Sequence, residues 1–394
     1  MPLLVMAHWD LIGTIPIRQP STATGAEKRP FYRRGVPRLN VPSPDPQIRA
    51  PYGSIGCKQP FVIAEIAQAH DGSLGMAHAF IDAAAQAGAD AVKFQTHISA
   101  AESSFDEPFR VEFSVQDKTR YDYWCRTEFT TEQWEGLADH CRNSGVTFLS
   151  SPFSVEAVHL FARLGMTLWK IASGELRSGE LLACILSAGD HVLVSTGMSS
   201  WSEIDETVTF LQSRGAEYTL MQCTSRYPTP LREVGLNILE EMRTRYACPV
   251  GLSDHSGTLY PALAAMARKA SVIEVHVTFD RRMFGPDVSA SITFDELAFL
   301  IRARNALIEM DSNPVDKDVM AESLDFMRAT FGKSLAPVRG LSAGTLLEPE
   351  MLMLKKPGGG IPREAAQEIV GRRLARDVVP ERILHWDDIE QDTQ

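Results

Sequence analysis

Two histidines stand at the ends of two short apolar segments of the chain. His255 follows segment 249–252 in the motif SDHS, and His276 closes segment 272–276 in the motif IEVHV. The alanine-rich stretch between the segments has the length of a crossover helix, which predicts two parallel strands with both tips on one face. A single histidine would more often be a loop hydrogen-bonder. Two imidazoles brought together suit a divalent metal with coordination positions left open.

Two lysines indicate a second kind of chemistry. Lys93 and Lys170 each interrupt an otherwise apolar strand-like segment, in AVKFQ and LWKIAS, so both side chains are expected to point inward. Cations accompanied by serine hydroxyls form a cradle for phosphate or carboxylate, and nearby carboxyl groups supply proton transfer. The alternative for any single lysine or serine is an exposed loop position.

The elements that must position these residues follow a repeated strand-then-helix pattern from Phe61 to about Arg304. About eight such units over roughly 250 residues predict a TIM (β/α)8 barrel of the α/β class. The alternative is a doubly wound open sheet, but no strand is followed by GxGxxG and the sequence has no P-loop. The predicted strands are 61–66, 91–95, 147–149, 168–171, 191–195, 218–222, 249–252 and 272–276.

In a TIM barrel the residues just past the strands share one face, and the active site lies there. The polar side chains at these strand tips are therefore predicted to converge on one site. They are Glu65, His70, Lys93, Gln95, His97, Ser150, Ser151, Lys170, Ser173, Glu175, Ser195, Thr196, Gln222, Thr224, Ser225, Tyr227, Ser253, His255, Glu274, His276 and Asp287.

The two ends of the sequence differ from the barrel pattern. Residues 1–58 are rich in Pro, Arg and Ser without helical or strand periodicity, which predicts an irregular leader before a barrel over 59–310. A charged linker over 311–333 leads to residues 334–394, where short extended runs alternate with turns such as RGLSAG and KPGGGIP. This texture predicts a small β-rich domain that cannot enclose a deep pocket by itself.

The composition restricts the partners and the compartment. With 44% hydrophobic and 23% charged residues, the chain is typical of a globular protein with a sizeable core. A net charge of -11 disfavours nucleic acid and anionic membranes, although a few local cations can still bind an anionic substrate. Scattered cysteines without a CxxC pair, and an N-terminal run without a basic n-region or a cleavage site, predict a cytoplasmic protein with reduced thiols and no transmembrane segment.

Ordered motifs from about residue 59 to the end carry a family resemblance. They are AEIAQAHDG (64–72), GADAVKFQT (88–96), FLSSPFS (148–154), WKIASGE (169–175), VSTGM (194–198), CTSRYPTP (223–230), GLSDHS (251–256), IEVHVTFDR with GPD (273–287) and KKPGGGIP (355–362). With these motifs the chain resembles the sialic acid synthase family of the NeuB type, which uses phosphoenolpyruvate in carbohydrate biosynthesis.

The resemblance implies a TIM barrel followed by an antifreeze-like (SAF) domain, assembled as a domain-swapped homodimer in which each small domain covers the partner's active site. It also implies metal-dependent condensation of phosphoenolpyruvate with an N-acyl-mannosamine-like aldose, giving a sialic-acid-type 2-keto-3-deoxy sugar acid and phosphate. A divalent metal, Mn2+ or Mg2+, held by His255 and His276 would polarise the aldehyde for attack by C3 of phosphoenolpyruvate.

Residue roles carry over from the matching motif positions. Glu65 would serve proton transfer or position the water that adds at C2, and Glu175, Tyr227 and Asp287 would face the sugar hydroxyls. Gln95 is placed with the substrate-binding residues. The positions that match the family's phosphoenolpyruvate ligands are Lys93, Lys170, Ser173, Ser195, Ser225 and Ser253.

Several positions depart from the family pattern. Ala69 replaces the asparagine of INHNG, Gln222 replaces the histidine before Cys223, and Val275 replaces a basic residue in the last strand motif. Lys356 replaces the small-domain arginine that in the family reaches the substrate's N-acyl group. Because lysine lacks the flat fork of donors, the sugar stays open. The alternatives are the same chemistry on a non-N-acetylated aldose in specialised metabolism, or a non-catalytic barrel relative.

Overall fold

The computed structural model describes residues 59–189 and 191–391, so the predicted leader over 1–58 lies outside the described residues. The chain divides between Glu309 and Met310 into two compact units. We call them the barrel unit and the C-terminal unit.

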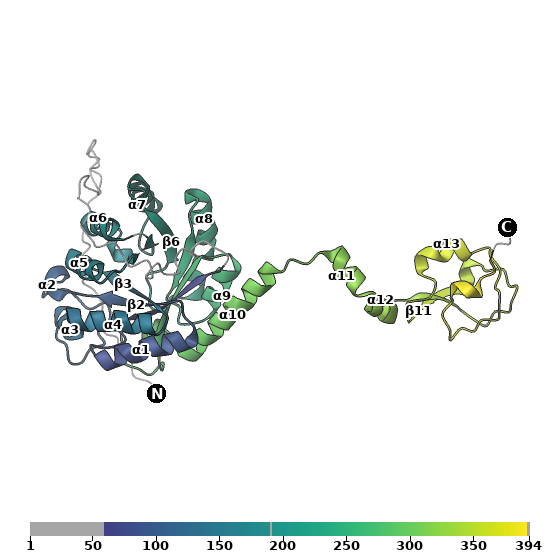
Figure 1. The fold of residues 1–394 in the computed structure, drawn as a ribbon, viewed down its shortest axis with the longest axis horizontal. Coiled ribbons are helices and arrows are strands. Elements are labelled where there is room, and N and C mark those ends of the chain that lie inside the picture. Colours follow the sequence, from purple (N-terminus) through teal and green to yellow (C-terminus); the bar gives the residue numbers. More distant parts are fainter. Residues whose placement is uncertain (1–58, 190, 392–394) are drawn as a thin grey trace, which may run out of the picture. The chain divides into compact units, whose positions relative to one another are not determined.

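The barrel unit is built on eight parallel strands in the order β3-β2-β1-β8-β7-β6-β5-β4, and β3 also packs against β4, so that the sheet nearly closes (Figure 1). The predicted TIM barrel is confirmed, and each strand lies within three residues of its predicted bounds. The strands are β1 (Phe61–Ala67), β2 (Ala91–Thr96), β3 (Thr147–Pro152), β4 (Leu168–Ile171), β5 (His191–Ser195), β6 (Glu217–Cys223), β7 (Val250–Asp254) and β8 (Val272–Thr278), and the short β9 (Ile292–Thr293) pairs with β8.

Helices cover the outside of the barrel (Figure 1). Three of them begin with a capping box, and the N-cap residues are Thr119, Thr130 and Ser200. In each, the N-cap side chain accepts from the backbone N–H of the third helical residue, whose side chain accepts from the backbone N–H of the N-cap residue. The helices are α1 (Leu74–Ala87), α2 (Ser99–Glu102), α3 (Arg120–Thr127), α4 (Thr131–Asn143), α5 (Val155–Arg163), α6 (Gly179–Ala188), α7 (Trp201–Ser213), α8 (Leu236–Tyr246), α9 (Tyr260–Ala267) and α10 (Phe294–Ser312).

Alternation along the strands sorts their side chains into two sets. Outward residues such as Val62, Phe94 and Trp169 pack in the main core with the helices. Inward residues near the start of the strands form a separate apolar plug. The plug consists of Phe61, Ile63, Ala91, Leu149, Leu168, Leu193, Met221 and Val272.

Two residues further along the strands, the inward positions become polar. These side chains are all 5% exposed or less, so their charges must be paired with one another or with a ligand. We call them the polar layer. It consists of Glu65, Lys93, Ser151, Lys170, Ser195, Cys223, Ser253 and Glu274.

The C-terminal unit has its own small core, which includes Leu335, Leu347, Ile361 and Leu374. Its strands β10 (Ser334–Pro337) and β11 (Leu352–Lys355) pair antiparallel, and α13 (Ala366–Ile369) follows them. Two helices, α11 (Lys317–Ser323) and α12 (Asp325–Phe331), lie in the segment predicted as the linker. In the described part of the chain, no helix combines the length and apolar character needed to cross a membrane.

Candidate active site

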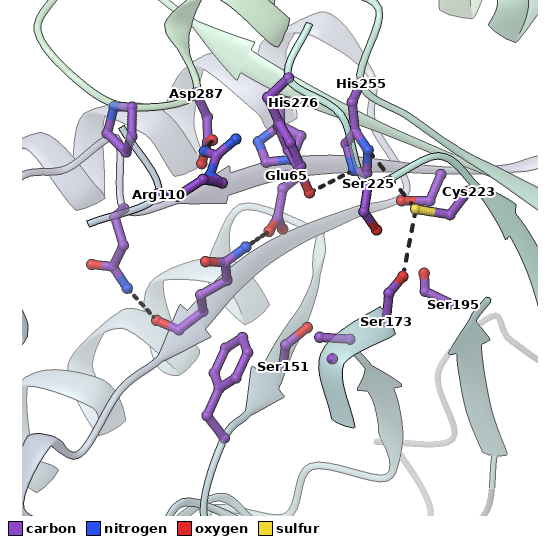
Figure 2. A pocket seen from close by; sticks show the side chains of 18 of the residues that line it. Glu65, Arg110, Ser151, Ser173, Ser195, Cys223, Ser225, His255, His276 and Asp287 are labelled. Carbon is purple, nitrogen blue, oxygen red and sulfur yellow. Dashed lines mark hydrogen bonds and ion pairs between the residues drawn. The ribbon is translucent and has the colours of Figure 1, made fainter. Parts of the chain in front are cut away.

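The polar layer forms the floor of a cavity of about 290 Å3 at the carboxyl ends of the strands (Figure 2). The residues two positions beyond the polar layer on β2, β7 and β8, namely Gln95, His255 and His276, line the same cavity. From the start of the strands toward their carboxyl ends, the inward side chains therefore form three layers. These are the apolar plug, the polar layer, and the candidate substrate and metal ligands. The predicted site residues that line the cavity are Glu65, Lys93, Gln95, Ser151, Lys170, Ser173, Ser195, Ser225, Tyr227, Ser253, His255, Glu274, His276 and Asp287.

Two lysines and two glutamates form an alternating ion-pair network in the floor. Nζ of Lys93 lies 2.8 Å from Oε1 of Glu65 and 3.9 Å from Oε2 of Glu274. Nζ of Lys170 lies 3.7 Å from Oε1 of Glu274 and donates to Oγ of Ser195. Both lysines also line the cavity, so an anionic ligand can bind them there.

The two carboxyl groups of the floor have opposite pKa shifts. Burial raises the pKa of Glu65 to about 7, against the lowering effect of Lys93. Burial also acts to raise the pKa of Glu274, but the charges of Lys170 and Lys93 outweigh it and hold that pKa below its ordinary value. Oε2 of Glu65 is buried and has no hydrogen-bond partner among the described residues. Environments that separate two pKa values in this way mark Glu65 as the group that can exchange a proton near neutral pH.

A set of hydroxyls surrounds Gly197, which follows β5. The backbone N–H of Gly197 donates to Oγ of Ser173 at 3.0 Å. A methyl group on Gly197 would lie 2.6 Å from Oγ of Ser225, 2.8 Å from Sγ of Cys223 and 3.0 Å from Oγ of Ser173. The glycine therefore keeps open a concave place whose rim carries serine hydroxyls, as phosphate-binding sites require.

The two histidines predicted to meet do so, with ring centroids 5.3 Å apart. Nδ1 of His255 lies 2.9 Å from the carbonyl oxygen of Thr224, which can only accept, so this nitrogen carries a proton. Nε2 of His255 lies 3.2 Å from the hydroxyl of Tyr227. Burial holds the pKa of His276 well below its ordinary value, so its imidazole is neutral.

This donor set fits a divalent cation. A carbonyl oxygen that holds the second ring nitrogen, as that of Thr224 holds Nδ1 of His255, is a usual feature of histidine ligands. The nearby cavity leaves room for oxygen ligands from a substrate or water. Within 59–189 and 191–391, no group of three or more His, Cys, Asp and Glu side chains is arranged around a common point for a metal. The two predicted metal ligands that the structure brings together are His255 and His276.

The outer wall of the cavity comes from residues 103–119, which contain no helix or strand. From this segment Arg110 reaches Asp287, with 2.6 Å between its Nη2 atom and Oδ1 (Figure 2). The guanidinium also lies over the ring of Tyr227, 4.1 Å from the centroid, and Tyr227 in turn stacks on His255 at 4.1 Å. Sequence reasoning missed Arg110, because no strand pattern places it. The aromatic and basic run PFRVEF was the available signal.

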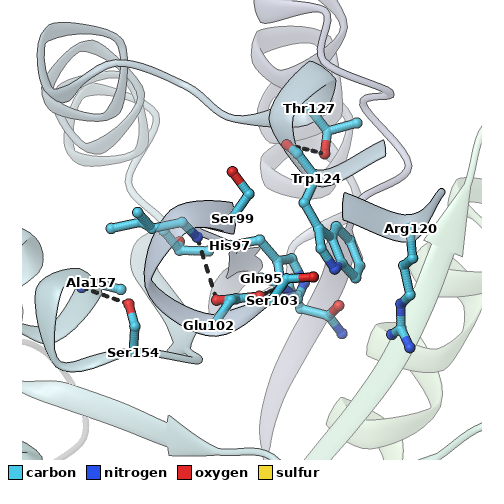
Figure 3. A network of polar contacts seen from close by, with 12 residues as sticks. Gln95, His97, Ser99, Glu102, Ser103, Arg120, Trp124, Thr127, Ser154 and Ala157 are labelled. Carbon is cyan, nitrogen blue, oxygen red and sulfur yellow. Dashed lines mark hydrogen bonds and ion pairs between the residues drawn. The ribbon is translucent and has the colours of Figure 1, made fainter. Parts of the chain in front are cut away.

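His97 supports the wall rather than lining it. Its ring is stacked between Trp124 and Phe153, with centroids 3.5 and 4.4 Å away. Its Nδ1 atom forms a hydrogen bond with Glu102, and Figure 3 shows His97 near Trp124 and Glu102. Trp124 and Phe153 both line the cavity. His70, the other histidine predicted at a strand tip, is buried against Phe129 and does not line the cavity.

Six further predicted residues do not line this cavity: Ser150, Glu175, Thr196, Gln222, Thr224 and Lys356. Glu175 ends a short 3-10 turn over Ser173–Glu175 and is not among the residues that line the cavity. Burial, with the charge of Glu102 as a smaller cause, raises the pKa of its carboxyl. Lys356 belongs to the C-terminal unit. The roles of Glu175 and Lys356 stay predictions.

Comparison with known proteins gives matches over most of the chain. The model of the NeuB family matches residues 80–315, and that of the SAF domain matches residues 332–390. N,N'-diacetyllegionaminic acid synthase of Campylobacter jejuni is 30% identical over 335 residues, which is 83% of this chain and 99% of that protein. Human N-acetylneuraminate-9-phosphate synthase is 28% identical over 81% of this chain and 90% of its own length.

A solved structure agrees with these matches. The crystal structure of N-acetylneuraminic acid (sialic acid) synthetase from Leptospira borgpetersenii, in complex with citrate, superposes with a TM-score of 0.60 at 28% identity. The superposition covers 69% of this chain and 93% of that one.

Proposed function

The chain belongs to the NeuB family and carries an SAF domain, and on this premise we propose that it condenses phosphoenolpyruvate with an N-acyl-mannosamine-like aldose. The products are a sialic-acid-type 2-keto-3-deoxy sugar acid and phosphate. One observation carries the proposal: two buried lysines and a set of serine hydroxyls lie in one cavity with two adjacent imidazoles and a glutamate whose pKa is about 7.

Phosphoenolpyruvate is the ligand of the floor. Its phosphate and carboxylate need several donors and at least two cations in a small volume. Lys93 and Lys170 supply the cations, and the serines of the polar layer with Ser173 and Ser225 supply hydroxyls. The apolar plug beneath them excludes water from below, which strengthens each of these contacts.

Glu65 acts as the general base of the reaction. The reaction requires water to add at C2 of phosphoenolpyruvate after C3 has attacked the aldehyde, and that water must lose a proton. The unpartnered Oε2 atom of Glu65 is available to receive it, and a pKa of about 7 suits the transfer. Gln95 donates to Oε1 of Glu65 at 3.1 Å and, with Lys93, fixes the orientation of the carboxyl group.

His255 and His276 hold the acceptor end of the cavity. A divalent cation, Mn2+ or Mg2+, bound by these imidazoles supplies Lewis-acid polarisation of the aldehyde oxygen. Tyr227 and Asp287, which lie beside His255 and Arg110, face the remaining sugar groups. The arrangement separates an anionic ligand on the floor from a polyol at the mouth.

The C-terminal unit is proposed to cover the cavity of a second copy in a homodimer. Apolar side chains are exposed on α11 and α12: Val319 is 63% exposed, Phe326 80% and Phe331 59%. Exposed apolar residues on such short helices need a partner surface, and a second copy of the same chain provides one in a symmetric dimer.

Phosphate release tests the function. Purified protein with Mn2+ and phosphoenolpyruvate is mixed with 2-acetamido, 2-hydroxy or 2-amino aldoses, and phosphate and the 2-keto product are measured together. Release that requires a 2-acetamido aldose supports the proposal. Release only with non-acylated aldoses supports the alternative that Lys356 favours, because its ammonium cannot reproduce an arginine fork. No release with any aldose would overturn both and indicate a non-catalytic relative.

A further inference from the structure

We propose that Arg110 determines acceptor specificity. Together with Asp287, it would form hydrogen bonds with an acylamino group of the sugar. The inference rests on the proposed function. It gives the outer wall of the cavity a role in recognising the acceptor sugar. It concerns a neutral amide as the recognised group, rather than a phosphate or a carboxylate.

Arg110 and Asp287 offer a ligand both a donor and an acceptor. Nη2 of Arg110 donates to Oδ1 of Asp287 at 2.6 Å, and this is the one hydrogen bond of the guanidinium within the described residues. The side chains are 39% and 18% exposed, and both line the cavity. The remaining N–H groups and the second carboxylate oxygen therefore face possible ligands side by side.

An acylamino group matches this pair. Its carbonyl oxygen accepts from the guanidinium, and its N–H donates to the carboxylate. Phe109 and Val111, the chain neighbours of Arg110, line the same cavity and give the acyl methyl an apolar contact. A phosphate would be repelled by Asp287, and an ammonium group by Arg110, so the neutral pair favours a neutral substituent.

The guanidinium stacks on the aromatic ring that in turn stacks on His255. It lies 4.1 Å from the ring centroid of Tyr227, which stacks on His255 at the same distance. Phe113, three residues further along, packs edge-on against Tyr123 with centroids 5.0 Å apart, which fixes the segment. A sugar whose aldehyde lies at the histidines can therefore reach Arg110 with a nearby substituent, and a preorganised donor reads that substituent without an ordering cost.

The test compares N-acetylmannosamine with mannose, which differ in one substituent. The wild type is expected to have the higher kcat/KM for N-acetylmannosamine. Arg110→Ala should lower the ratio of the two kcat/KM values by about tenfold or more, through KM for N-acetylmannosamine, because a site built to hydrogen-bond a group discriminates strongly against its absence. The KM for phosphoenolpyruvate should change less than twofold. Arg110→Lys should lose part of the discrimination, since lysine keeps the charge and lacks the fork.

Arg245 provides a matched control. It pairs with Asp205 at 2.6 Å and stacks over Trp201 on the outside of the barrel, so Arg245→Lys removes the same kinds of contact away from the cavity. In Arg245→Lys, the ratio of kcat/KM for N-acetylmannosamine to kcat/KM for mannose should equal that of the wild type. A ratio within twofold of the wild type in both Arg110 variants, or a wild type that prefers mannose, overturns the inference and leaves the condensation itself standing. A wild type that releases no phosphate with either sugar overturns the proposed function and this inference with it.

Discussion

Nζ of Lys93 lies 2.8 Å from Oε1 of Glu65 on the neighbouring strand, and the two side chains are only 3% and 1% exposed. The register of the sheet places the two residues opposite each other on β2 and β1. A buried pair of this kind contributes little net stability, since the cost of removing both charges from water offsets their attraction. Its presence under an open cavity therefore favours a role in binding and proton transfer.

Glu65→Gln should change how stability depends on pH. Because burial raises the native pKa of Glu65 from 4.5 to about 7, the folded protein keeps a proton that the unfolded chain has already released. The free energy of unfolding contributed by this group therefore falls as pH rises from about 4.5 to about 7. Urea unfolding at pH 5 and pH 8 should show the wild type losing up to about 3 kcal/mol relative to the variant. Parallel pH profiles for the two proteins would refute the shifted pKa.

Lys170→Met should weaken phosphoenolpyruvate binding without loss of the fold. The variant keeps the volume of the side chain and removes a charge-assisted contact worth about 2–3 kcal/mol, which corresponds to roughly 30–100-fold in kcat/KM for phosphoenolpyruvate. Lys317→Met changes an exposed residue on α11 in the same way and should leave this value unchanged. Equal kinetic constants for the two variants would remove Lys170 from the ligand site.

His276→Gln should abolish tight binding of Mn2+ measured by titration calorimetry. Loss of Lewis-acid polarisation, worth several kcal/mol, should reduce kcat by at least about a hundredfold. Treatment of the wild type with a chelator should have the same effect and should be reversed by Mn2+. His78→Gln, in α1 where the ring contacts His140, is the control. Metal stoichiometry that survives in a His255→Gln, His276→Gln double variant would contradict the assignment.

Gly197→Ala should obstruct the place between Ser173, Cys223 and Ser225. The added methyl would lie within 3.0 Å of all three side chains, so their hydroxyl and thiol groups must move. We expect a cost in stability of about 1–3 kcal/mol and a fall in kcat/KM for phosphoenolpyruvate of more than about tenfold. In Gly136→Ala, a methyl on α4 meets nothing within 4 Å, and the change should stabilise the helix by up to about 1 kcal/mol. Unchanged kinetics in Gly197→Ala would show that phosphate binds elsewhere.

Phe326→Glu should dissociate the proposed homodimer. Phe326 is 80% exposed within its own chain, and loss of a large apolar contact at an interface typically costs about 1–2 kcal/mol or more, about tenfold in the dissociation constant. Sedimentation velocity should show a larger monomer fraction, with turnover falling in parallel. Lys317→Glu introduces a negative charge on the adjacent helix without removing an apolar contact and serves as the comparison. A wild type that is monomeric and fully active would rule out the swapped arrangement.

The strands and the floor of the site could be predicted from the sequence because they follow a period of two. Lys93 interrupts the apolar run AVKFQ at an inward position, two residues after Ala91 of the plug, so its direction is fixed by local pattern alone. The meeting of His255 and His276 follows from the same regularity together with the parallel crossover between β7 and β8. These inferences needed no knowledge of distant contacts.

The wall could not be predicted in this way. Arg110 lies in a segment without helix or strand, and its place beside Asp287 depends on a contact between residues 177 positions apart in the chain. His70 and His97 show the opposite case: both come after strands, yet His70 packs against Phe129 and His97 supports the wall through Phe153. His70 lies in the turn that follows β1, where the period of two no longer fixes the direction of a side chain.

The floor belongs to the strands, whereas the wall belongs to residues 103–119, which contribute Phe109, Arg110, Val111 and Phe113 to the cavity. Substitutions in the strands disturb the packing of the whole barrel, but a connecting segment tolerates insertion and exchange. Under the proposed function, evolution can therefore change the accepted sugar through this segment while the strands keep the phosphoenolpyruvate site. Grafting this segment from a relative with a different acceptor onto the present barrel should transfer the preference without a new catalytic apparatus.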